Sequence, residues 1–161
     1  MPLTYRLWEP RDVPDIQRLW KEETGWGELS DIGREWFRQN PCEGSMVVVA
    51  VDESERVVGE FVFIAYRVRV NGREYRALRA LAPIVSQEWR KFRTKDPVDH
   101  PMSGMYRFGA LTAKERGDGL MFMLPNPSFK RFLNMFPGMR SRSRGEPTRM
   151  SRWRFVAATT W

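Results

Sequence analysis

One carboxylate interrupts an otherwise apolar segment of the chain. Glu60 lies in the run 57–66, where it alternates with aliphatic side chains. If this side of a strand faces a cleft, burial would raise the pKa of the Glu60 carboxyl and make it a candidate general base. The alternative is an outward-facing glutamate on an exposed sheet face. Glu88, which follows a later strand, is the second candidate.

The single histidine and the single cysteine offer two further reactive groups. His100 precedes Pro101 and could act as a general base, or it could cap the helix that follows. Cys42 has no histidine near it in the sequence, so we interpret it as a passive thiol. One histidine and one cysteine do not suffice for a classical zinc site, and we expect no metal.

The segment 96–138 combines the features of an anion-binding cleft. A glycine-containing loop leads into a helix, the helix ends at Gly117, and an apolar strand follows over 120–124. Backbone N–H groups at a helix N-terminus are unpaired and favour phosphate. The order of elements therefore predicts a cleft between a strand end and a helix N-terminus. Asn126 marks the exit of the strand, where it could also simply hold a turn.

Alternation and helical periodicity predict several strands and four helices. Asn71-Gly72 between alternating segments indicates a hairpin, and Asp12 is placed to cap the first helix. We expect the charged segment 87–99 to be a loop. The expected strands are 5–9, 46–51, 57–70, 75–85, 120–124 and 153–161, and the expected helices are 13–23, one from 31, one from about 101 and 128–136.

The composition is that of one folded domain. The chain has 161 residues, 42% of them hydrophobic and 13% aromatic, which is far from the composition of a disordered chain. We expect a single domain over 1–161, which could be one domain of a longer protein. No apolar stretch reaches membrane-spanning length, and the first residues lack the hydrophobic core of a signal peptide. These features favour a cytoplasmic location.

Positive charge is concentrated near the C-terminus. The net charge is +7, and six arginines lie between Arg140 and Arg154 with Glu146 as the single acid among them. Such a cluster fits a nucleic acid, an acidic protein or a phosphorylated ligand. A solvated loop that keeps the protein soluble is the alternative.

The order of elements resembles that of the GNAT superfamily of N-acyltransferases. Arg6 and Asp12 flank the first strand as in that family's opening motif, and Val57-Val58-Gly59 resembles its VVG hairpin. The segment 100–106 resembles the start of the cofactor helix, and Leu124–Pro127 resembles the Pro-Asn that closes the fifth strand. The resemblance covers nearly the whole chain. It implies an α+β fold, a three-layer sandwich in which about four helices flank a mixed, mostly antiparallel sheet.

The resemblance also implies a co-substrate, acetyl-CoA or a longer acyl-CoA, in a V-shaped opening between the fourth and fifth strands. N–H groups at the start of the cofactor helix would bind the pyrophosphate, and the fourth strand would flank the pantetheine arm. Asn126, at the thioester end, joins Glu60 as a catalytic candidate. The implied cofactor-binding residues are Ala82, Pro83, Ile84, Val85, Ser103, Gly104, Met105, Tyr106 and Phe129.

The chain departs from the family pattern at the cofactor loop. Gly104 is the one glycine left of the Gln/Arg-x-x-Gly-x-Gly loop, and Ser103 precedes it. Leu133 stands where many members place a tyrosine as the acid for the departing thiolate. These departures bear on catalysis more than on the fold.

Three functions follow from these patterns. The first is an N-acyltransferase that moves an acyl group from acyl-CoA, or from an acyl-carrier protein held by the arginines 140–154, to an amine. The second is a GNAT-like module that binds acyl-CoA or a protein partner without turnover. The third, a basic nucleic-acid-binding domain, has no helix-turn-helix or RNA-binding signature to support it. Sheet edges could also pair two copies of the chain into a homodimer.

Overall fold

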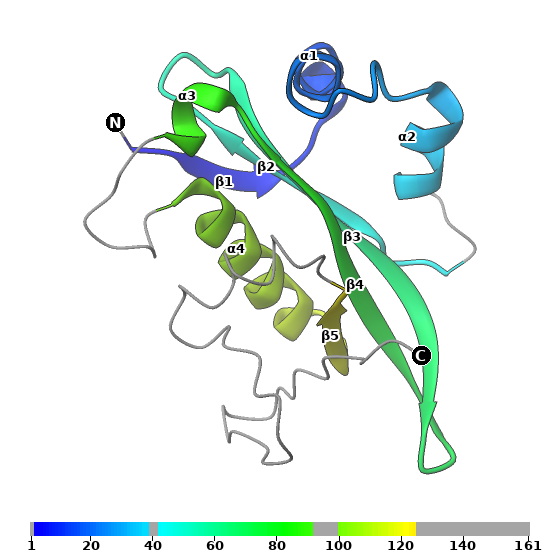
Figure 1. Cartoon of the computed structure of the whole chain (residues 1–161). Coiled ribbons are helices and arrows are strands. Elements are labelled where there is room, and N and C mark those ends of the chain that lie inside the picture. The colour runs from blue at the N-terminus through cyan, green and yellow to red at the C-terminus, as the bar shows by residue number, and fades with distance from the viewer. Residues whose placement is uncertain (1, 39–41, 92–99, 125–161) are drawn as a thin grey trace.

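The computed structural model describes residues 2–38, 42–91 and 100–124, and its architecture is a five-stranded sheet with helices on both faces (Figure 1). The strand order is β1-β2-β3-β4-β5. All neighbours are antiparallel except β4 and β5, which run parallel. The strands are β1 Thr4–Leu7, β2 Met46–Val51, β3 Val57–Val70, β4 Arg73–Val85 and β5 Leu120–Met123.

The predicted meander is confirmed residue by residue at its centre. β2 and β3 have the predicted bounds, and the turn between β3 and β4 lies at Asn71-Gly72. Asn71 and Gly72 both have positive φ, 50° and 76°, as a type I′ hairpin turn requires. The far end of this hairpin extends beyond the rest of the sheet as a two-stranded arm (Figure 1).

Helix α4 covers one face of the sheet, whereas α1 and α2 cover the other (Figure 1). On the α4 face, Phe61 and Phe63 pack with Met105 and Tyr106 in the largest hydrophobic cluster. The opposite face holds two smaller clusters, which α1 and α2 complete. The helices are α1 Val13–Glu23, α2 Asp31–Arg38, α3 Gln87–Arg90 and α4 Pro101–Glu115, and a 3-10 turn, Pro10–Asp12, precedes α1.

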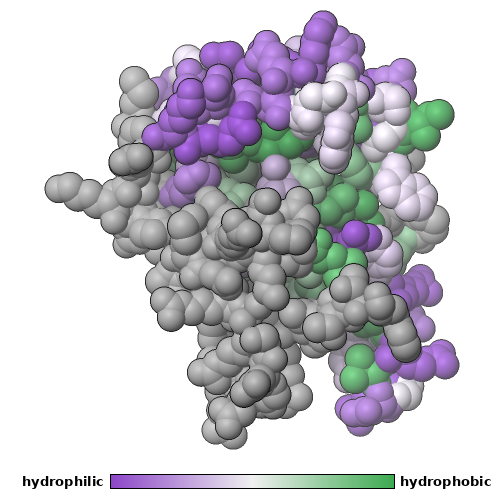
Figure 2. All heavy atoms as spheres, in the orientation of Figure 1, coloured by the Kyte–Doolittle hydropathy of each residue, from purple (hydrophilic) through white to green (hydrophobic). Residues whose placement is uncertain are grey.

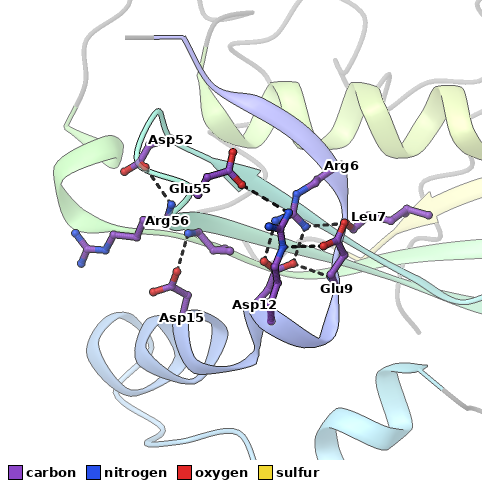
Figure 3. Close-up of polar contacts among 10 residues, drawn as sticks. Arg6, Leu7, Glu9, Asp12, Asp15, Asp52, Glu55 and Arg56 are labelled. Atoms are coloured by element: carbon purple, nitrogen blue, oxygen red, sulfur yellow. Dashed lines mark hydrogen bonds and ion pairs between the residues drawn. The ribbon is translucent and has the colours of Figure 1, made fainter.

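A buried ion pair fixes the entry into α1 (Figure 3). Arg6 donates two hydrogen bonds to Asp12, at 2.6 and 2.8 Å, and the Glu9 backbone N–H donates a third at 2.7 Å. Burial acts to raise the pKa of Asp12, but these hydrogen bonds and the Arg6 charge together hold it below its ordinary value. Asp12 is the N-cap residue of α1, as predicted, but its side chain makes no capping hydrogen bond to the helix, because its oxygens bind Arg6 and the Glu9 N–H instead.

One other expectation is corrected between β4 and α4, and two cannot be compared. The segment after β4 is not entirely a loop, since Gln87–Arg90 forms the short helix α3 with Trp89 buried. The predicted helix 128–136 and strand 153–161 lie outside the described residues. For the part of the chain that is described, the α+β fold with a mixed sheet is confirmed.

Candidate functional site

In the residues that the structure describes, β5 pairs with only part of β4. They pair from Ala77 with Leu120 to Ala80 with Met123, and β4 then continues for five more residues to Val85. Among the described residues, no strand pairs with the outer edge of Leu81–Val85. Backbone groups on that edge are therefore available to an extended ligand, in the manner of an added strand.

A bulge in β4 lies within Leu81–Val85. Glu60 pairs with Ile84 and Val62 pairs with Leu81, so Phe61 alone faces the two residues Ala82 and Pro83. Ala82 has a φ of +48°, a left-handed conformation that costs a non-glycine residue about 1–2 kcal/mol. Bulges of this kind bend a strand and redirect side chains next to binding sites. The bulge thus directly follows the stretch of β4 that pairs with β5.

The end of this pairing, at Ala80 and Met123, borders a cleft of about 420 Å³. The floor of the cleft is β4, and α1 with the turn after it supplies the opposite side. Figure 2 shows largely hydrophobic atoms in the hollow below α1, with hydrophilic atoms among them. The lining residues are Trp20, Glu23, Thr24, Trp26, Phe61, Arg79, Ala80, Leu81, Ala82, Pro83, Ile84, Val85, Arg90, Met123 and Leu124.

Contacts at both ends of α1 set the position of its cleft-lining side chains. Near its start, Asp15 accepts a hydrogen bond from the Val57 N–H, and Arg18 donates one to the Val57 carbonyl, each at 2.9 Å. At its end, Glu23 accepts the Gln87 N–H at 2.8 Å and forms an ion pair with Arg90. Helix α1 is thus tied to the start of β3 and to α3, which lies just beyond β4.

Glu60 points into the protein and not to solvent. Its side chain is on the α1 face of β3, 2% exposed, and it accepts a hydrogen bond from the Trp20 indole N–H at 2.6 Å. Trp20 lines the cleft, whereas Glu60 borders a much smaller cavity beneath α1 and α2. The outward-facing alternative is therefore excluded, and the Trp20 ring separates the carboxylate from the cleft.

The N-terminus of α4 is satisfied within the chain. His100 is its N-cap and accepts a hydrogen bond from the Met102 N–H through Nδ1 at 3.2 Å, while the His100 carbonyl accepts from the Ser103 and Gly104 N–H groups at 2.8 and 3.1 Å. The cap interpretation of His100 is confirmed. Burial lowers the pKa of His100, which favours the neutral ring that a hydrogen-bond acceptor requires.

The predicted anion-binding residues of α4 face the sheet. A Cβ on Gly104 would overlap the Tyr5 ring of β1, so this glycine allows the helix to approach the strand closely. Met105 is fully buried, and Tyr106 packs on Phe61 and Phe63 with ring centroids 6.0 and 6.3 Å away. Burial also raises the pKa of the Tyr106 hydroxyl.

The structure thus separates the predicted site residues into two groups. Ala82, Pro83, Ile84 and Val85 all line the cleft, as the pantetheine prediction requires. Ser103, Gly104, Met105, Tyr106 and Glu60 are not among the residues that line it, so a direct role for them in binding stays a prediction. Asn126, Phe129 and the arginines 140–154 lie outside the described residues.

Several cleft residues were missed by sequence reasoning. Glu23 follows Ile16, Leu19 and Trp20 along one helical face, and a carboxylate on that apolar face was a usable signal. Arg79 interrupts the apolar part of β4 just as Glu60 interrupts β3. Trp26 packs against Trp20 with tilted rings whose centroids are 6.0 Å apart. The sequence did not indicate that Trp26 lines the cleft, because this residue follows the end of the helix.

The described part of the chain has neither a cluster of metal-binding side chains nor a membrane-spanning helix. No group of three or more His, Cys, Asp or Glu residues in 2–38, 42–91 and 100–124 could hold a metal ion. No helix within these same ranges is long and apolar enough to cross a membrane.

Solved structures of known proteins share this architecture. No family profile and no curated protein matches the sequence. Among solved structures, an acetyltransferase of Trypanosoma brucei is similar with a TM-score of 0.65 and 15% identity, over 91% of this chain and 99% of that one. A GNAT family N-acetyltransferase of Escherichia coli in complex with CoA has a TM-score of 0.59 and 18% identity, over 81% and 67% of the two chains.

Glucosamine-6-phosphate N-acetyltransferase of Arabidopsis thaliana is similar over 92% of this chain and 97% of its own, with a TM-score of 0.62 and 12% identity. At these identities the likeness concerns the fold. The chain has the fold of the GNAT N-acyltransferases.

Proposed function

We propose that this protein is an N-acyltransferase that uses acyl-CoA as donor and an amine as acceptor. The observation that carries the proposal is the cleft of about 420 Å³ at the bulge of β4, along the stretch Leu81–Val85, whose outer edge pairs with no strand among the described residues. An extended pantetheine arm could accept and donate hydrogen bonds along Leu81–Val85, as a strand does. The fold of CoA-binding acetyltransferases supports the same donor.

The cleft also suits the chemistry of acyl transfer. The acceptor must reach the thioester as a neutral amine, and an environment poor in water favours the uncharged form. Trp20, Phe61 and Ile84 make much of the lining apolar. We propose Glu60 as the base, with the proton passing around the Trp20 ring by a water molecule, and Asn126 as the second catalytic residue.

The first test is thermal unfolding with saturating CoA, acetyl-CoA and longer acyl-CoAs. A ligand at a hundred times its dissociation constant adds about 2.7 kcal/mol to the free energy of unfolding, which raises the melting temperature measurably. Met123→Trp, which fills the cleft, should remove this shift. Leu111→Trp is the matched control, because Leu111 is 51% exposed on α4. No shift with any donor would contradict the proposal.

A second candidate, an acyl-CoA-binding module without turnover, is favoured by two observations. The first N–H groups of α4 already bind His100, and Glu60 lies behind Trp20 and not in the cleft. Release of free thiol from acetyl-CoA in the presence of a broad amine panel separates the two candidates. Binding without thiol release would favour the module.

A further inference from the structure

Arg79 is an arginine placed on the apolar floor of the cleft. It lies on β4 between Ile64 of β3 and Phe122 of β5, its register partners on either side. Ile64 is 3% exposed, and Phe122 packs on Tyr66 with ring centroids 6.0 Å apart. The side chain shares its sheet face with Leu81 two residues later, and both line the cleft. Arg79 is therefore the last charged residue of β4, and it lies within the stretch that pairs with β5.

The guanidinium of Arg79 lacks a protein counter-ion in the part of the chain that the structure describes. Its Nε–H is buried without an acceptor there, and no carboxylate of residues 2–38, 42–91 or 100–124 pairs with it. A buried donor without a partner is costly, more so when it carries charge. Such a group persists in a cleft when a ligand supplies the acceptor.

The other charged groups nearby do not compensate Arg79. Glu23, the carboxylate of the cleft, is engaged by Arg90 and by the Gln87 N–H. Glu60 shares the sheet face of Arg79, but it lies four positions from Ile64 along β3, or about 13 Å at the rise of a strand. Within the described residues, the charge of Arg79 thus has no carboxylate to balance it and is available to a ligand.

We propose that Arg79 is a specificity residue that binds a carboxylate or phosphate group of a substrate. The planar guanidinium suits either anion, since it can donate two parallel hydrogen bonds. Trp20, Trp26 and Leu81 provide an apolar surface beside it, so the ligand combines the anionic group with an apolar body. This inference rests on the proposed function in assigning that group to the acceptor amine or to the acyl chain of the donor.

The test compares anionic ligands with neutral partners of the same shape. On the acceptor side the probes are N-acetylated phenylalanine and leucine against their amides, and phenyl phosphate against phenol. On the donor side the probes are succinyl-CoA against butyryl-CoA. Wild-type protein should bind the anionic member of at least one pair about 10- to 100-fold more tightly, the range of a charge-assisted hydrogen bond. The side that shows this preference is the source of the anion.

Two variants assign the preference to Arg79. Arg79→Met should remove it while leaving the neutral member bound as before, and Arg79→Lys should retain part of it. Arg69→Met is the control, because Arg69 is an exposed arginine in the projecting arm of β3. Thermal unfolding without ligand completes the set, since loss of a buried unpaired donor should leave the fold equally or more stable.

The results separate this inference from the proposed function. A preference for the acetylated amino acids that depends on Arg79, without a shift by any CoA ester, would support the anion site and contradict the proposed donor. A CoA shift without an anionic preference in either arm would overturn the anion site. A large loss of stability in Arg79→Met that weakens both members of each pair equally would also overturn it, because the arginine would then be structural.

Discussion

The requirement for glycine at position 104 can be tested against two explanations. In the family resemblance Gly104 brings backbone close to pyrophosphate, whereas in the structure it brings α4 close to Tyr5. A Cβ at this position would lie well inside the 3.0 Å limit that real Cβ atoms observe, in contact with the tyrosine ring. Gly104→Ala therefore requires the helix or the ring to move.

The size of the effect follows from two opposing contributions. Overpacking of this kind costs about 1–3 kcal/mol, and alanine gains up to about 1 kcal/mol over glycine in a helix interior. We expect Gly104→Ala to lower the free energy of unfolding by about 1–2 kcal/mol. For a chain of this length that corresponds to about 2–8 °C in melting temperature.

The decisive measurement is a double-mutant cycle with Tyr5→Ala, followed by urea unfolding. With the ring removed, Gly104→Ala should be neutral or stabilising, which gives a coupling energy of about 1–3 kcal/mol. Acyl-CoA binding by the double variant then separates the explanations, because retained binding leaves packing as the role of Gly104. An equal cost of Gly104→Ala with and without the Tyr5 ring would refute the packing explanation.

Two further predictions concern strain and pH. Ala82→Gly should raise the free energy of unfolding by about 0.5–1 kcal/mol, because relief of the positive φ exceeds the entropy that glycine adds to the unfolded chain; an unchanged or lower urea midpoint would contradict this. Asp12→Asn should destabilise the protein more at pH 7 than at pH 3. The pKa of Asp12 is lower in the folded state than in the unfolded state. Its contribution to the free energy of unfolding is therefore present above the pKa of the unfolded state, about 4, and is lost as the pH falls through the pKa of the folded state. Urea unfolding at both pH values measures the difference, and an equal cost at both would refute it.

More of the sheet than of the candidate site could be predicted from the sequence. Strand alternation and the Asn71-Gly72 turn are local signals, and they predicted β2, β3 and the hairpin to the residue. The direction of Glu60 depends on Trp20, 40 residues earlier in the chain, and a local pattern contains no information about that contact. Asp12 shows the same limit at short range, since Arg6 competes with the helix N-terminus for its oxygens.

The position of Glu60 makes one last prediction about the chemistry. Two carboxylates could accept the proton of an acceptor amine, Glu60 behind the Trp20 ring and Glu23 inside the cleft. Glu23 already binds Arg90 and the Gln87 N–H, so its oxygens are engaged in contacts that hold α1 against α3.

We therefore expect Glu60→Gln, with the amine acceptor identified by thiol release, to lower kcat/KM by about 10²–10⁴-fold, the usual contribution of a general base. Glutamine preserves an acceptor for the indole N–H, so the fold should survive the change. Glu23→Gln should loosen the contact between α1 and α3 and raise KM with a smaller effect on kcat. If Glu60→Gln kept the wild-type kcat/KM across the pH range, Glu60 would have a packing role only. The acceptor amine would then reach the cleft already neutral.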